Sequence, residues 1–112
     1  MKLETIIESL SLEVKTVEQN LIQEVTGGYV SDLLSDVIAN AKVGNLWVTL
    51  QGHPNIVAVA TLKDLSSIVL VNGRQPEQEA LDRANEEGIP ILSTEMPAFE
   101  LAGELYKLIK EK

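Results

Sequence analysis

The sequence predicts an α/β fold, a small three-layer domain in which a mostly parallel sheet of about five strands is flanked by helices. Two observations carry this prediction. Short runs rich in valine, isoleucine and leucine alternate with segments whose apolar residues recur at helical spacing. Turns that contain glycine, asparagine or proline separate the two kinds of segment. Strands that alternate with helices are typical of parallel sheets with right-handed crossovers.

The chain has 112 residues, and we expect residues 1–112 to form a single domain. The absence of cysteine excludes disulfides, thiol catalysis and cysteine-ligated metal sites. The net charge is −8, and the nine lysines and arginines are scattered, which argues against binding to nucleic acid or to an anionic membrane. No apolar run approaches the roughly 20 residues of a membrane span, and the N-terminus lacks the layout of a signal peptide. We therefore expect a cytoplasmic protein.

Two helices and three strands are expected in the first half of the chain. Leu3, Ile6 and Leu10 share one helical face, which predicts a short amphipathic helix. A second helix is expected to begin at Ser31, a suitable N-cap, and to end before Gly44. The strands expected here are residues 12–15, 21–25 and 46–50, and the last is apolar enough to be covered on both faces.

Residues 56–65 fit two structures. Residues 56–60 have the composition of a strand, whereas Pro54, Leu62 and Leu65 favour a short buried helix. We expect the helix, because a strand would break the alternation. The remaining expected elements are a strand over 67–71, a helix over 77–87, a strand over 89–92 and a final helix after Pro97. The final helix is expected to bury Phe99, Leu101, Ala102, Leu105, Leu108 and Ile109.

Four expected loops, at residues 26–28, 51–55, 72–75 and 93–96, each follow a strand and precede a helix. Ligands of open α/β sheets bind at the carboxyl ends of the strands, and helix N-termini there favour anions. We therefore expect a small anionic metabolite of the nucleotide or phosphate type. The candidate ligand-binding residues are Thr26, Gly27, Gly28, His53, Asn55, Gly73 and Arg74. Structural alternatives are a tight turn or a close backbone approach at the two adjacent glycines and a surface ion pair at Arg74.

The residue pattern supplies no catalytic centre. Neither a Walker loop nor the dinucleotide fingerprint is present at Gly27 and Gly28. His53 is the only histidine, and a loop-capping or solvent-facing side chain is favoured over a phospho-acceptor or general base. We expect no catalytic residue, no metal site and no cofactor.

Three segments together resemble the DRTGG domain family: the Thr-Gly-Gly of residues 26–28, residues 52–55 and residues 68–74. The resemblance covers about residues 5–110. Glu24 and Val25 stand where the family has aspartate and arginine, so any anion contact of that arginine is absent. The resemblance implies an α/β regulatory module, of the kind that accompanies CBS domains in regulated pyrophosphatases and occurs in some phosphotransacetylases. It also implies similarity in fold to the N-terminal domain of HPr kinase/phosphorylase, whose P-loop this sequence lacks.

We therefore expect a non-catalytic regulatory module that forms a homodimer and binds a small anionic metabolite. One alternative is an interaction module that docks on a partner enzyme without a small ligand, through apolar surface on the first helix or on residues 56–65. The other is a phosphate-handling enzyme or phospho-acceptor that uses His53.

Overall fold

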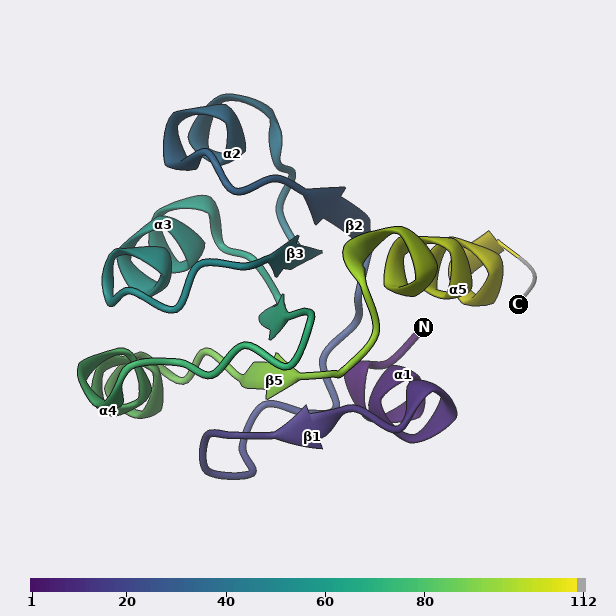
Figure 1. Cartoon of the computed structure of the whole chain (residues 1–112), viewed down its shortest axis with the longest axis horizontal. Coiled ribbons are helices and arrows are strands. Elements are labelled where there is room, and N and C mark those ends of the chain that lie inside the picture. Colours follow the sequence, from purple (N-terminus) through teal and green to yellow (C-terminus); the bar gives the residue numbers. More distant parts are fainter. Residues whose placement is uncertain (111–112) are drawn as a thin grey trace.

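The computed structural model describes residues 1–110, which form a five-stranded sheet between two layers of helices (Figure 1). The strands are β1 (Glu13–Val14), β2 (Gly27–Val30), β3 (Asn45–Thr49), β4 (Ser67–Leu70) and β5 (Ile91–Ser93). The helices are α1 (Leu3–Leu10), α2 (Leu34–Asn40), α3 (Asn55–Lys63), α4 (Gln78–Glu87) and α5 (Ala98–Lys110). The sheet order is β1-β5-β4-β3-β2, in which only β1 is antiparallel to its neighbour. The predicted mostly parallel α/β fold is confirmed.

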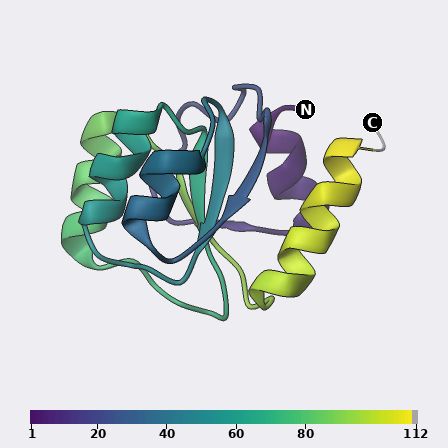
Figure 2. The same cartoon turned by 90° about the horizontal axis from the view of Figure 1, so that it is seen from above.

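The central strands place alternate side chains in two separate cores. Trp47 and Ile68 lie on the face covered by α2, α3 and α4, whereas Leu46, Val48 and Val69 lie on the face covered by α1 and α5 (Figure 2). All five are at most 1% exposed. Burial on both faces explains why these strands are continuous apolar runs rather than alternating ones.

Residues 56–65 are helical, as predicted: α3 spans Asn55–Lys63. Ile56, Val57, Val59 and Ala60 are all buried, because α3 lies between α2 and α4 in its layer (Figure 1). A helix with neighbours on both sides shows a weak amphipathic pattern. This packing is the physical reason for the ambiguity of its sequence.

The predicted strand over residues 21–25 was wrong, because β2 begins at Gly27 and pairs in parallel with β3. Residues 21–25 instead bond to the start of the chain: the amides of Leu3 and Glu4 donate to the carbonyls of Gln23 and Leu21. Val25 is buried in the core shared with α1. An apolar segment of this kind satisfies its backbone against a helix N-terminus as well as in a sheet.

The predicted burial of Phe99 was also wrong, since its side chain is 89% exposed. The buried face of α5 is set by Leu101 and Leu105, which lie one turn apart. Phe99 precedes Leu101 by two positions and therefore points away from that face. The helix expected to begin at Ser31 begins at Leu34 instead, and Ser31 Oγ accepts a hydrogen bond from the Leu33 amide.

A hydrogen-bonded side-chain cluster ties α2 to the edge strand β2. The Tyr29 hydroxyl lies 2.9 Å from both carboxylate oxygens of Asp36, and Asn40 Nδ2 donates to Asp36 Oδ1 at 2.9 Å. Hydrogen bonds from Ser31, Tyr29 and Asn40 lower the pKa of Asp36. The hydrogen bond to Asp36, followed by burial, raises the pKa of Tyr29.

We predict that this cluster makes stability depend on acid pH. A carboxyl group whose pKa is depressed on folding stabilises the fold above its unfolded pKa, and this contribution is lost as the pH falls through the folded pKa. Asp36→Asn should therefore lower the melting temperature at about pH 7 and weaken the fall in stability as the pH drops below about 4. Thermal unfolding followed by circular dichroism measures both effects. Asp82→Asn, on the exposed side of α4, is the control and should keep the wild-type pH profile; identical profiles for all three proteins would contradict the prediction.

Candidate functional site

The predicted ligand-binding residues fall into two groups at opposite ends of the sheet. Thr26, Gly27 and Gly28 lie at the amino end of β2, where Gly27 pairs with Asn45 at the start of β3. The other four residues follow the carboxyl ends of β3 and β4. The expected convergence of residues 26–28 with the other loops was wrong, because residues 27 and 28 belong to the strand rather than to the loop after it.

His53 lies at the start of α3 and is exposed. Its Nδ1 accepts a hydrogen bond from the Asn55 amide at 3.1 Å, so the side chain occupies one of the free donors of the helix N-terminus. This exposed side chain that accepts a hydrogen bond fits the loop-capping or solvent-facing alternative, and the ligand-binding role of His53 stays a prediction. Asn55, the first residue of α3, is exposed beside it.

The loop after β4 is fastened to the segment after β5. The Gly73 amide donates to the Thr94 carbonyl at 2.9 Å, and Gly73 has a φ of +68°. The positive φ favours glycine here, and a Cβ at Gly73 would lie 2.8 Å from Glu95 Oε1, so a larger residue would displace this carboxylate. Arg74 is exposed, and its guanidinium forms no ion pair within residues 1–110.

Two carboxylates, those of Asp32 and Glu95, lie at the carboxyl edge of the sheet, where the parallel strands end. Asp32 Oδ1 accepts hydrogen bonds from Thr49 Oγ1 at 2.8 Å and from the Leu50 amide at 2.7 Å. Glu95 lies over Gly73 on the next loop. Asp32 takes up donors that an anionic ligand needs, and both carboxylates repel its charge.

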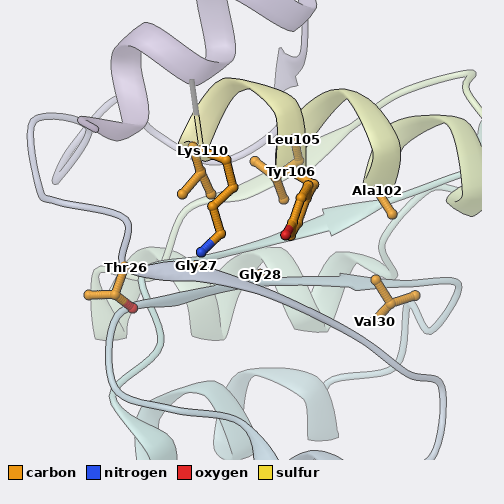
Figure 3. Close-up of a pocket in the computed structure, with 9 residues that line it drawn as sticks. Thr26, Gly27, Gly28, Val30, Ala102, Leu105, Tyr106 and Lys110 are labelled. Carbon is orange, nitrogen blue, oxygen red and sulfur yellow. The ribbon is translucent and has the colours of Figure 1, made fainter. Parts of the chain in front are cut away.

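A pocket of about 290 Å³ lies on the other side of the molecule, between β2 and α5 (Figure 3). Its lining residues are Thr26, Gly27, Gly28, Val30, Ala102, Leu105, Tyr106, Ile109 and Lys110. The Lys110 amine points toward the strand at Gly27, and the Tyr106 hydroxyl points toward the same strand (Figure 3). One group of predicted residues, Thr26 to Gly28, therefore does line a pocket, with partners that the sequence did not single out.

Gly28 is the residue that lets α5 lie so close to β2. A Cβ at this position would lie 2.9 Å from Cδ2 of the buried Leu105. Neither Gly27 nor Gly28 has a positive φ, so the close approach, rather than a turn, accounts for Gly28. The Thr26 hydroxyl donates to the Val43 carbonyl at 2.8 Å and accepts from Asn45 Nδ2 at 3.1 Å, which fixes the entry into β2.

The pocket combines one cation, one aromatic ring and a strand backbone with apolar walls. Lys110 Nζ lies 5.7 Å from the centroid of the Tyr106 ring, within the range of a cation–π contact. Because β2 is the edge of the sheet, one side of its backbone has no strand partner among residues 1–110. Such a pocket suits a small molecule with an anionic group and an aromatic or apolar part.

Tyr106 and Lys110 carried no sequence signal for a site. Lys110 was accounted for by the dipole at the end of the last helix, and Tyr106 has no motif around it. Within residues 1–110, no three acidic or histidine side chains are placed to hold a metal ion. No helix in the same part of the chain has the length and apolar character to cross a membrane.

No protein-family model and no curated protein matches the sequence. A solved structure that is similar holds the CBS and DRTGG domains of the regulatory region of Clostridium perfringens pyrophosphatase, complexed with its activator diadenosine tetraphosphate. The TM-score is 0.69 at 18% sequence identity, over 94% of this chain. The chain has a DRTGG-like fold. It spans 45% of the solved chain, less than half of the DRTGG-containing regulatory region.

We predict that the two adjacent glycines differ sharply in their tolerance of a side chain. Gly28→Ala should lower the free energy of unfolding by about 1–3 kcal/mol, because its Cβ forces Leu105 and α5 outward. Gly27→Ala is the matched control: its Cβ would meet Asn45 Nδ2 at an ordinary 3.4 Å, so its stability should stay close to wild type. Urea unfolding of both variants measures the difference. Equal stability of the two variants would contradict the close approach of α5 to Gly28.

Proposed function

We propose that this chain is a non-catalytic regulatory module that forms homodimers and binds a small anionic metabolite of the nucleotide or phosphate type. The observation that carries the proposal is the pocket in which Lys110 and Tyr106 face the backbone of residues 26–28. The regulatory role is supported by the solved structure with the same fold, whose regulatory region was complexed with a nucleotide activator. A cytoplasmic location belongs to the proposal and agrees with the absence of cysteine.

The proposed ligand site is the pocket between β2 and α5. The Lys110 ammonium would meet a phosphate or carboxylate, and the Tyr106 ring would contact a base or another flat group. The volume of about 290 Å³ is near the lower limit for small-molecule sites, which favours a mononucleotide or one end of a longer ligand.

The carboxyl edge of the sheet, with His53, Asn55, Gly73 and Arg74, is the competing location. Its exposed Arg74 is available, but Asp32 and Glu95 add negative charge to the same edge. Each location has one exposed cation, Lys110 in the pocket and Arg74 at the carboxyl edge. Replacing each of them by alanine in turn therefore distinguishes the two locations.

We predict that Lys110→Ala weakens anion binding and that Arg74→Ala does not. The probes are AMP, ATP, diadenosine tetraphosphate and inorganic pyrophosphate, each tested by thermal shift. A probe at about 100 times its dissociation constant should raise the wild-type melting temperature by roughly 10 °C. Loss of the Lys110 contact should weaken affinity roughly tenfold, because a charge-assisted hydrogen bond is lost.

The opposite pattern, with affinity lost in Arg74→Ala and kept in Lys110→Ala, would move the site to the carboxyl edge. No shift of the wild-type protein with any of the four probes would contradict the binding of nucleotides and phosphates. Both variants replace exposed side chains, so their melting temperatures without ligand should match the wild type and show that the fold is intact.

A further inference from the structure

We propose that the exposed side of α5 is a self-docking face, on which two copies of this chain meet with their α5 helices antiparallel. This α5 outer face consists of Phe99, Glu100, Gly103, Tyr106 and Lys107. The inference rests on the homodimer of the proposed function and identifies the surface that forms it.

The α5 outer face is apolar and exposed at its centre. Phe99 is 89% exposed and Tyr106 is 66% exposed, although both are large and hydrophobic. A Cβ at Gly103 would meet nothing within 4 Å. Positions 99, 103 and 106 lie on one side of a helix at successive turns. A shallow hollow lies on this side, lined by both aromatic residues and Gly103, and it offers room for a side chain from outside.

Most apolar residues of the first helix and of residues 56–65, where a docking surface was the alternative, lie in the cores, although Leu62 is 68% exposed. Leu3 and Ile6 of α1 are fully buried, as are Ile56 and Ala60 of α3. Within residues 1–110, the two exposed aromatic side chains, Phe99 and Tyr106, both lie on α5, where no docking surface was predicted.

The charges of the α5 outer face are complementary to those of the same face on a second copy. Glu100 lies in the first turn of α5, and Lys107 and Lys110 lie in the last turn. Neither Glu100 nor Lys107 forms an ion pair within residues 1–110. Opposite charges at the two ends of one helix favour antiparallel pairing, because parallel pairing sets like charges against each other.

A two-fold axis near Gly103 brings the matching groups together. Residues 100 and 107 are nearly equidistant from this axis, so Glu100 of each copy faces Lys107 of the other. Residues 99 and 106 are related in the same way. Tyr106 lines both the pocket beside β2 and the hollow on the outer face, so each Phe99 packs against the side of the Tyr106 ring that faces this hollow in the other copy. The absence of a side chain at Gly103 lets the two helices cross closely. The same patch is thus used twice, as a two-fold symmetric dimer requires.

The pairing of Glu100 with Lys107 favours a second copy of this chain over an unrelated partner. Each copy has a net charge of −8, so two copies repel each other over most of their surfaces. The α5 outer face has equal numbers of positive and negative side chains around an apolar centre. The repulsion between two copies is therefore offset locally at this face. An unrelated partner would have to reproduce the same alternation of charge.

The test is the dimer dissociation constant measured by sedimentation equilibrium. Glu100→Lys and Lys107→Glu should each weaken the homodimer roughly tenfold or more, because two attractive contacts per dimer become repulsive. The double variant Glu100→Lys/Lys107→Glu should restore the wild-type dissociation constant. An equal mixture of the two single variants should form heterodimers more tightly than either variant forms homodimers.

Two controls keep the result specific to this face. Glu87→Lys, at the exposed end of α4, changes the charge equally and should leave the dissociation constant unchanged. Phe99→Ser should weaken the dimer but leave the melting temperature of the monomer, measured well below the dissociation constant, unchanged, since the side chain is exposed within one copy.

A dimer that none of the α5 variants weakens would overturn the self-docking face and leave the homodimer itself intact. A wild-type protein that is monomeric at every concentration would overturn both, while the thermal shifts with nucleotides would remain a separate test of ligand binding. Weakening by both single variants without rescue in the double variant would overturn the antiparallel arrangement.

Discussion

The central strands β3 and β4 are buried on both faces, and this burial determines where the other elements can lie. Trp47 and Ile68 require cover from α2, α3 and α4, and Leu46, Val48 and Val69 require cover from α1 and α5. Parallel strands have no hairpins, so each connection must cross the sheet as a helix or a long segment. The sheet ends at β1 on one side and at β2 on the other.

The carboxyl edge of the sheet and the pocket between β2 and α5 differ in their charged groups. At the carboxyl edge, Asp32 and Glu95 bond to or lie against backbone from neighbouring loops, so negative charge is part of the structure there. Beside β2, the lack of a side chain at Gly28 brings the end of α5 over the strand, and with it the amine of Lys110. A chain of strong net negative charge thus presents a cation over exposed strand backbone at one place in its fold.

The sequence predicted the elements whose signal is local. The central strands, α3 and α4 follow from apolar spacing and from Gly88 at the end of α4, and these were confirmed. Strand β2 was misplaced because glycine has no side chain to reveal a strand pattern, and its pairing with β3 is decided between distant segments. Of the residues that line the pocket, Thr26, Gly27 and Gly28 were singled out because two adjacent glycines are typical of a turn, although both glycines lie in β2. Lys110 reaches them only through the packing of α5, which no local pattern reveals.

Strand β1 pairs with β5, and this pairing joins the two ends of the chain. Ser93 Oγ lies 3.4 Å from Glu13 Oε1, across a sequence separation of 80 residues. During synthesis, residues 13 and 14 must therefore wait unpaired until most of the chain has left the ribosome. Contacts of such high sequence separation form late and slow the folding of a small domain. The N-terminal segment is thus expected to be the last part of the sheet to join it, and a nascent chain that stops before β5 would be left with an open strand edge beside β4.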